Sequence, residues 1–406
     1  MEQFGVSRTP ELVFGAGVIT RLGEQLRMLG ARSVVVVAGA SVMSVAETRE
    51  GIAASIDGAE VRRAFVRYDA LPESLDLFQG AHGPFAEASP DVVDAIVAAT
   101  AEPPDAVVAI GGGSAIDTGK ALCVAFLEDG SIADYLEGVG SRRPSGRKLP
   151  FIAVPTTAGT GSEATKNAVL SRPGPAGFKK SLRHDRFIPD VALIDPLLQL
   201  TCGRAQTAAS GLDAITQLLE AYISTSANPV TDALALDGLT AAGRSFLRAV
   251  ERGGTDPDSR AGMAYAAYLS GVCLANAGLG TVHGLAGPAG ALSSVPHGVF
   301  CGTLLPHVVD RIVATIAGRR DAIAVLGKLA AAGRALSGRT AGSLDDQIRM
   351  LTNRLVEFVR VAALPGLSAY GIDAPLARRI AEAGDNKQSP CQFSVDERVA
   401  LMMHAI

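Results

Sequence analysis

Three consecutive glycines stand between a β-branched run and a helical pattern, and this junction restricts what the chain can fold into. Residues 105–110 form a short apolar run typical of a strand buried on both faces, and residues 115–127 have the apolar spacing of a helix. The turn between them, Gly111–Ser114, lets the backbone reverse sharply and present N–H groups at the positive end of the helix. The pattern favours a phosphate-binding turn, although an ordinary glycine-rich turn is the plainer interpretation.

The same alternation of strand and helix extends over the first half of the chain. Residues 33–38 and 149–154 have strand character, and residues 92–100 have helical periodicity. Alternating units of this kind predict a parallel, doubly wound sheet. A segment from about Tyr68 to Pro90, rich in Pro, Gly and acidic residues, is predicted to be an extended surface loop.

The character of the sequence changes after Asp195-Pro196. From Ala205 onward, Ala, Leu and Arg recur at helical spacing between Gly and Pro breaks. The expected helices cover residues 205–224, 229–250, 259–275, 278–293, 300–317, 320–336, 344–362, 375–384 and 394–404. We therefore predict an α/β fold with a Rossmann-like N-terminal parallel sheet domain, residues 1–196, and an all-α C-terminal domain, residues 197–406.

Composition excludes several classes of protein. Of 406 residues, 48% are hydrophobic and 19% charged, which supports large cores and argues against disorder. The net charge of −4, without a basic run, argues against nucleic acid as a partner. The N-terminus lacks the pattern of a secretory signal, and no uninterrupted apolar stretch reaches membrane-spanning length. The five cysteines are scattered, and we interpret them as reduced thiols that mostly serve packing. Together these features lead us to expect a cytoplasmic protein without membrane contact.

A second loop, residues 154–163, also follows a predicted strand and concentrates hydroxyl groups and glycines. Two such loops after neighbouring strands are expected to converge on one ligand. Its threonines are candidates for bonding a nicotinamide amide or ribose, or else they form a Thr-rich cap. Ser114 and Asp117 are predicted to cap the helix after the glycine turn in the manner of a capping box.

With these two loops, the sequence resembles the iron-containing (group III) alcohol dehydrogenases. Residues 111–120 match the family's GGGSxxDxxK motif, and residues 155–165 match its PTTxGTGSEVT segment. Residues 189–196 resemble its domain-joining segment, and Lys179 resembles a family lysine beside the cofactor. The resemblance implies hydride transfer between NAD(P) and a small-molecule alcohol or aldehyde, a divalent metal (iron or zinc), and a homodimer. The cofactor-binding residues that we expect are Gly39, Ser41, Gly111, Gly112, Gly113, Ser114, Asp117, Thr156, Thr157, Thr160, Ser162 and Lys179.

Two residues after the first strand bear on the choice of dinucleotide. Many NAD-preferring members carry an Asp there, which bonds the adenosine ribose and repels a 2′-phosphate. This chain has Gly39 at that place and Ser41 two residues on. The pattern favours NADP, or the use of both NADP and NAD, unless Gly39 is only a turn residue.

The family's metal shell is an Asp and a His one helical turn apart, followed by two more His. Asp213, His283 and His297 match three of these positions, but Gln217 stands at the fourth. A neutral Gln ligand is expected to weaken metal binding or to change the preferred metal. The alternative is a lost metal site, in which the remaining three side chains form a hydrogen-bonded polar cluster.

A second departure is Gly287, which replaces the proton-relaying His that the family has four residues after His283. The proton must then come from elsewhere, and a larger pocket favours a bulkier or more polar aldehyde. His283 and His297 are the candidate catalytic residues, polarising the carbonyl through a metal or acting directly. Three alternatives stay open: a metal-independent reductase of the maleylacetate reductase type, a sugar-phosphate cyclase-like lyase on the same fold, and a binding protein without catalysis.

Overall fold

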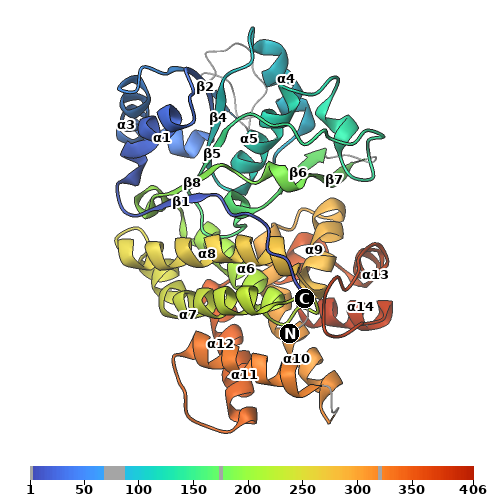
Figure 1. Cartoon of the computed structure of the whole chain (residues 1–406). Coiled ribbons are helices and arrows are strands. Elements are labelled where there is room, and N and C mark those ends of the chain that lie inside the picture. Colours follow the sequence, from blue (N-terminus) through green and yellow to red (C-terminus); the bar gives the residue numbers. More distant parts are fainter. Residues whose placement is uncertain (1–2, 68–86, 173–176, 319–321) are drawn as a thin grey trace. The chain divides into compact units, whose positions relative to one another are not determined.

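The computed structural model describes residues 3–67, 87–172, 177–318 and 322–406 (Figure 1). It divides into two compact units. The first, here called the sheet unit, comprises Arg8–Thr157 and Ser162–Gln199. The second, the helical unit, comprises Met1–Ser7, Ala158–Gly161 and Leu200–Ile406. Most of the predicted loop at 68–90 lies outside the described residues.

The sheet unit is built on a six-stranded sheet whose paired strands are all parallel, in the order β1-β8-β5-β4-β2-β3. Its strands are β1 (Glu11–Phe14), β2 (Ser33–Ala38), β3 (Arg62–Arg67), β4 (Ala106–Gly111), β5 (Phe151–Pro155) and β8 (Val191–Ile194). Its α-helices are α1 (Leu22–Met28), α2 (Ala40–Met43), α3 (Ala46–Asp57), α4 (Pro90–Ala99) and α5 (Gly113–Ala125). A separate antiparallel hairpin pairs β6 (Asn167–Arg172) with β7 (Phe178–Arg183). The predicted parallel sheet is confirmed.

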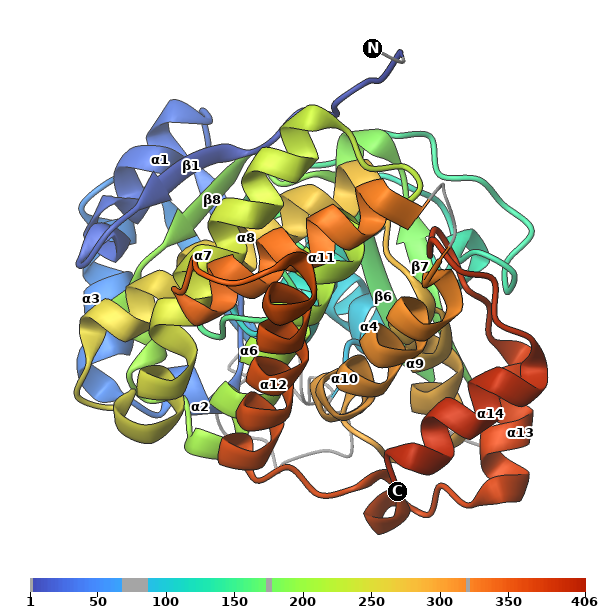
Figure 2. The same ribbon diagram turned by 90° about the horizontal axis from the view of Figure 1, so that it is seen from below.

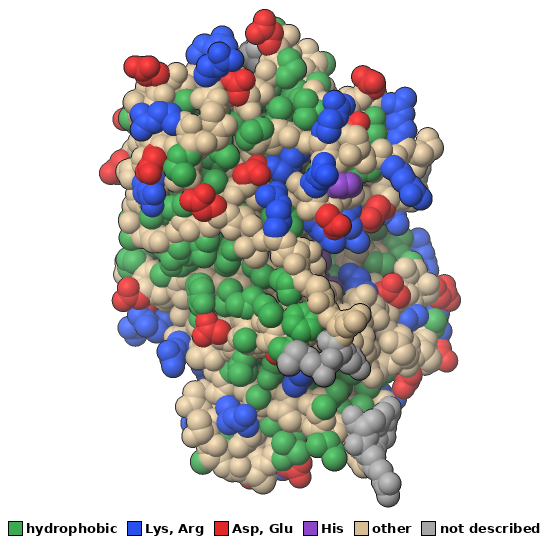
Figure 3. All heavy atoms as spheres, viewed as in Figure 1, with side chains coloured by type: hydrophobic (Ala, Val, Ile, Leu, Met, Phe, Trp, Pro, Cys, Tyr) green, Lys and Arg blue, Asp and Glu red, His purple; other side chains and the backbone are tan. Residues whose placement is uncertain are grey.

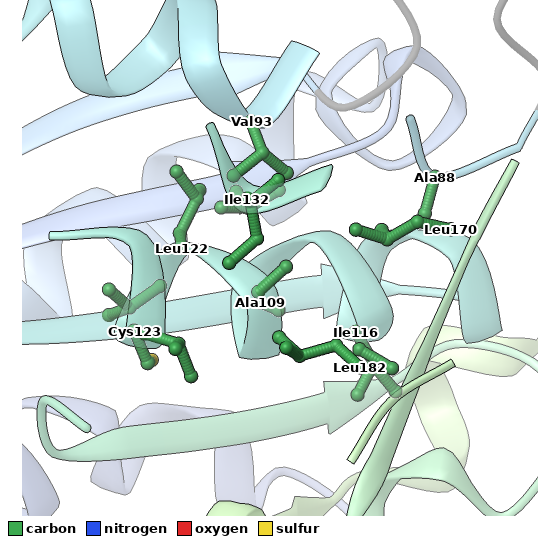
Figure 4. Packing of buried hydrophobic residues seen from close by; sticks show 14 of the residues in the cluster. Ala88, Val93, Ala109, Ile116, Leu122, Cys123, Ile132, Leu170 and Leu182 are labelled. Carbon is green, nitrogen blue, oxygen red and sulfur yellow. The ribbon is translucent and has the colours of Figure 1, made fainter. Parts of the chain in front are cut away.

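Alternate residues of β2 explain why helices cover both faces of this sheet. Val34 and Val36 pack in one buried cluster with α1 and α3, while Val35 and Val37 pack in another with α4 and α5. Successive strand side chains point to opposite faces, so an unbroken valine run is what a doubly covered strand requires. In the second cluster, Figure 4 shows side chains from α4, α5 and the segment after α5 directed toward one another.

Three strands were predicted within two residues of their observed ends. The strands that the sequence did not reveal were β1, β3, β6, β7 and β8. β3 reads Arg62-Arg63-Ala64-Phe65-Val66-Arg67, with charged side chains that mask its strand character, and β1 and β8 are only four residues long. Short or charged strands carry little periodicity, and their positions are set by pairing with neighbours.

The helical unit consists of packed helices, as the sequence predicts. They are α6 (Arg204–Tyr222), α7 (Pro229–Arg252), α8 (Pro257–Ala277), α9 (Thr281–Leu292), α10 (His297–Ile316), α11 (Ile323–Ser337), α12 (Leu344–Ala362), α13 (Ala374–Ala383) and α14 (Val395–His404). Figure 2 shows α13 beside α14. Side chains of Asn228, Ser343 and Ser394 begin three of these helices as reciprocal capping boxes. The sharp starts explain why the predicted boundaries lie close to the observed ones.

Among the described residues, α10 is long and apolar enough to cross a membrane by length and composition, and 67% of that stretch is buried. α8 and α9 pass the same test only as a pair bent by 101°. Such burial is expected of a core helix, so this is weak support for a membrane span. On the face shown in Figure 3, acidic and basic side chains are intermingled.

Candidate active site

The glycine turn joins β4 to α5 in the sheet unit, where the sequence analysis places it. Gly111 ends the strand and pairs with Pro155, and α5 begins at Gly113. A Cβ on Gly111 would lie only 2.5 Å from the Ala115 Cβ, so the turn has no room for a side chain there. The first N–H groups of a helix have no intrahelical acceptor, and they lie at its positive end. This turn therefore fits a pyrophosphate.

The start of the threonine-rich loop, Thr156 and Thr157, lies beside this turn within the sheet unit. The N–H of Thr156 donates to the Gly111 carbonyl at 2.9 Å. A Cβ on Gly112 would lie 3.3 Å from the Thr157 hydroxyl oxygen. The starts of the two loops therefore lie together, and the shared ligand stays a prediction.

The predicted capping box of Ser114 and Asp117 is wrong. The N-cap residue is Gly112, which makes no side-chain cap bond, because the helix begins one residue before Ser114. Asp117 instead accepts hydrogen bonds from the Ser162 hydroxyl and, at 3.0 Å, from the Val169 N–H. Asp117 and Ser162 thus bond to each other, and their contact with the cofactor stays a prediction.

A buried lysine is the centre of that support. Lys120 is 1% exposed, and its Nζ lies within 3.2 Å of four oxygens, two of Ser162, one of Thr165 and one of Asn167. Burial lowers the pKa of Lys120 to about 8, and the charge of Asp117 opposes this shift. The lysine ties α5, which follows the glycine turn, to the end of the threonine-rich loop and to the start of β6.

Glu163 gives this region a pH dependence. Its side chain is 2% exposed, and burial raises its pKa to about 7. Because the folded pKa exceeds the unfolded value, the stabilisation is full below about pH 4.5 and is lost as pH rises through about 7. The free energy of unfolding is expected to fall by roughly 2 kcal/mol between about pH 5 and about pH 7.5 through this group.

Urea unfolding followed by far-UV circular dichroism measures this loss, since the chain has no Trp. Glu163→Gln keeps a neutral polar side chain and should remove that part of the slope, whereas the exposed Glu50→Gln should leave it intact. An unchanged slope in Glu163→Gln would show that the pKa of this carboxyl is the same in the folded and the unfolded protein.

The remaining expected cofactor residues are placed as follows. Gly39 is buried directly after β2, and the side chain of Ser41 lies outside what the structure describes. Lys179 lies on β7 and forms an ion pair with Glu87, with 2.5 Å between Nζ and Oε1. Thr160 belongs to the helical unit. The structure thus brings Thr156 and Thr157 to the glycine turn and leaves the contributions of these other residues as predictions.

In the helical unit, four side chains that can ligate a metal gather around one point. The donor atoms of Asp213, His283, His297 and Cys301 all lie within 4.8 Å of one another. Asp213 Oδ1 is 3.2 Å from His283 Nε2 and 3.5 Å from His297 Nε2. Cys301 Sγ is 3.8 Å from the first of these nitrogens and 3.7 Å from the second. Three of the four residues were predicted from the sequence.

These separations fit a single ion. With ligand bonds of about 2.0 to 2.3 Å, neighbouring donors of a tetrahedral site lie roughly 3.3 to 3.7 Å apart. The chemistry of the set, one carboxylate, two imidazoles and one thiol, also suits a first-row divalent metal. The residues present therefore fit the metal that the family implies.

Gln217 and Cys301 show how the site differs from the sequence expectation. Gln217 Nε2 donates to Asp213 Oδ2 at 3.2 Å, and its Oε1 lies 3.0 Å from the Ser270 hydroxyl. Both ends of this amide are engaged, so it holds Asp213 rather than pointing a free oxygen at the cluster. Cys301 was overlooked as a packing thiol, although its position one helical turn after His297 is a ligand spacing.

Glu220 is a further residue that the sequence analysis did not assign. It is 4% exposed, and it accepts from His283 Nδ1 at 2.7 Å and from the Val282 N–H at 2.7 Å. Carboxylates of this kind orient ligating histidines and fix which nitrogen faces the metal. Here the contact directs Nε2 of His283 to the cluster.

The charges within the cluster support one another. Burial would raise the pKa of the Cys301 thiol, but the imidazoles of His283 and His297 outweigh this effect and lower it. Burial would lower the pKa of His283, but Cys301, Asp213 and Glu220 raise it well above its ordinary value. The same contacts thus lower the pKa of the thiol and raise the pKa of the imidazole.

Gly287 leaves open space, as the sequence analysis expected. A Cβ built on it would meet no atom of the described residues within 4 Å, whereas one on Gly284 of the same helix would lie 2.0 Å from the Asp385 carbonyl oxygen. The space at position 287 is therefore a property of that site and not of α9 as a whole.

A parallel sheet with a phosphate-type turn, followed along the chain by helices that carry a His, Asp and Cys cluster, is the combination that the family resemblance implies. The model for iron-containing alcohol dehydrogenases matches residues 9–196, and that for the family's C-terminal region matches residues 207–405. The chain belongs to the iron-containing alcohol dehydrogenase family, as its motifs predicted.

Individual relatives agree with this assignment. The chain is 36% identical to 1,3-propanediol dehydrogenase of Klebsiella pneumoniae over 298 residues, 73% of this chain and 72% of that protein. It is 42% identical to long-chain-alcohol dehydrogenase 1 of Geobacillus thermodenitrificans, over 51% of this chain and only 52% of that protein. The crystal structure of a 1,3-propanediol oxidoreductase superposes over 100% of both chains with a TM-score of 0.84 and 28% identity. These relatives are oxidoreductases that act on CH–OH groups.

Proposed function

We propose that this protein is an NAD(P)-dependent alcohol dehydrogenase or aldehyde reductase, which transfers a hydride between a nicotinamide and the carbon of a small alcohol or carbonyl compound. The observation that carries the proposal is the coexistence of the glycine turn with the Asp213, His283, His297 and Cys301 cluster. Residues 1–196 would bind the dinucleotide, and residues 197–406 would hold the metal and the substrate. A cytoplasmic homodimer is the form that we expect.

The residues of the chain have distinct tasks in this reaction. The turn at Gly111–Ser114 binds the pyrophosphate through backbone N–H groups, and Thr157 lies against it where it can orient the cofactor. Asp213, His283, His297 and Cys301 would hold the metal, and a bound divalent ion polarises a carbonyl oxygen as a Lewis acid. His297 has a side chain that is 36% exposed, so it is the cluster member most open to a substrate.

The proton for the nascent alkoxide does not come from position 287, because Gly287 carries no side chain. Water or a substrate group that reaches His297 supplies it in this proposal. The open space at Gly287 also favours a substrate with bulk or polarity next to its carbonyl. Polar or branched aldehydes should therefore be reduced with higher kcat/KM than acetaldehyde.

A cofactor-linked screen of aldehydes and alcohols on the metal-loaded protein tests the function. Oxidation of NADH or NADPH that depends on an aldehyde, with deuterium carried from the cofactor's C4 to the product carbon, is the expected result. Cofactor binding without turnover on any substrate would contradict it and would favour a binding protein. Elimination from a sugar phosphate without net redox change would favour the lyase.

Cofactor preference follows from Gly39. Gly39→Asp places a carboxylate where it repels a 2′-phosphate and bonds a ribose hydroxyl, so the ratio of kcat/KM for NADPH to that for NADH should fall by about 10-fold to 100-fold. Steady-state kinetics with both cofactors measures the ratio. Gly327→Asp adds the same charge on α11, where a Cβ meets no atom of the described part of the chain within 4 Å, and should leave the ratio unchanged. An equal ratio in wild type and Gly39→Asp would place the adenosine ribose elsewhere.

A further inference from the structure

The metal cluster contains one donor that the family's ligand pattern does not supply. That pattern has a His one turn after the Asp of α6, and this chain has Gln217 there. The amide of Gln217 is held between Asp213 and Ser270. A metal bound by the three matching residues alone would therefore lack its fourth protein ligand.

Cys301 places a further donor atom beside both histidines. It lies on α10, one helical turn after His297, is 0% exposed, and places Sγ near the Nε2 atoms of both histidines. A buried thiol has no packing reason to face two imidazole nitrogens, since an apolar environment suits it as well. Its position is that of a ligand.

The partners of the other donors leave one atom of each for the centre. Asp213 Oδ2 is bonded by Gln217, so Oδ1 faces the histidines. His283 Nδ1 is bonded by Glu220, so Nε2 faces the centre. Four donors thus converge from α6, α9 and α10, and the outer atoms of Asp213 and His283 are already paired, which is the arrangement expected around a bound ion.

We propose that Cys301 replaces the missing imidazole, and that Asp213, His283, His297 and Cys301 together bind one tetrahedral divalent ion of the zinc type through O, N, N and S donors. A thiolate is a soft ligand, and a tetrahedral site that includes N and S donors favours zinc or cobalt. Iron(II) prefers a site with harder donors. Gln217 then has the role of orienting Asp213. The proposal concerns the same site as the proposed function but does not require turnover.

Cobalt(II) substitution of the full-length protein gives a direct readout. A thiolate ligand produces a sulfur-to-cobalt charge-transfer band in the near ultraviolet, and tetrahedral coordination produces intense visible bands. We expect both in the wild type, with one ion per chain. Cys301→Ser should lose the charge-transfer band and bind zinc at least about 10-fold to 100-fold more weakly in competition with a chromophoric chelator.

Matched variants keep the test decisive. Cys273→Ser, which changes another buried thiol of the helical unit, should keep the wild-type spectrum and affinity. Gln217→Ala should keep the charge-transfer band, and Gln217→His in the Cys301→Ser background should recover binding without that band. Far-UV circular dichroism confirms that each variant is folded.

Three outcomes would overturn the proposal: no stoichiometric ion in the wild type, no charge-transfer band in its cobalt form, or unchanged affinity and spectrum in Cys301→Ser. Each is distinguishable from failure of the proposed function. An enzyme with the band but no hydride transfer would contradict the function alone, and an active enzyme without the band would contradict the thiolate ligand alone.

Discussion

Replacement of His283 by alanine is expected to abolish stoichiometric metal binding and to lower kcat/KM for aldehyde reduction by about 10²-fold to 10³-fold. The Nε2 atom of the imidazole contacts Asp213 and Cys301 at the centre of the cluster, and its Nδ1 atom is bonded to Glu220. Its loss removes one ligand and leaves a buried carboxylate without its partner. Stabilisation of the developing oxyanion is then lost, which typically costs a factor of this size.

Metal analysis together with steady-state kinetics measures both effects in one preparation. His307→Ala is the control, because His307 lies on α10 with His404 as its ring neighbour and is not a member of the cluster. It should retain the metal and the activity. If His283→Ala keeps the wild-type kcat/KM, the cluster takes no part in the reaction. The glycine turn would then be the only supported part of the site.

Replacement of Lys120 by methionine is expected to lower the free energy of unfolding of the sheet unit by about 3–5 kcal/mol. Methionine preserves the length of the side chain, but it leaves the Ser162, Thr165 and Asn167 oxygens without their donor and leaves Asp117 without its counter-charge. Since these contacts join α5 to the segment after the threonine loop, affinity for the dinucleotide should fall as well.

Urea unfolding at neutral pH measures the loss. Lys166→Met is the matched control, because that lysine pairs at the surface with Asp185 and should change stability by at most about 1 kcal/mol. If Lys120→Met unfolds at the wild-type urea concentration, the buried contacts of the lysine do not contribute to the fold.

Much of the fold was predictable because its elements are long or strongly patterned. The valine run of β2 and the helices from α6 to α14 follow simple periodicities, and the capping residues Asn228, Ser343 and Ser394 mark helix starts. The boundary at α5 was misplaced because a glycine triplet has no intrinsic start signal. Gly112 is the extended N-cap residue, and the helix already begins at Gly113, one residue before Ser114.

Site residues that belong to a sequence motif were predictable. Site residues whose role depends on tertiary contacts were not. Asp213, His283 and His297 match a known order along the chain. Cys301 acquires its meaning only when α10 brings it to the histidines, and the sequence offers just its spacing from His297 as a signal. Gln217 lies on the same face of α6 as Asp213, as predicted. The hydrogen bond from the Ser270 hydroxyl on α8 to its amide oxygen could not be predicted from the sequence.

X-ray absorption at the zinc edge of the metal-loaded enzyme reads the ligands of this site directly. We predict one sulfur at about 2.3 Å and three nitrogen or oxygen donors at about 2.0 to 2.1 Å, with the sulfur contribution lost in Cys301→Ser. A shell of nitrogen and oxygen atoms alone in the wild-type enzyme would contradict the thiolate-containing metal centre.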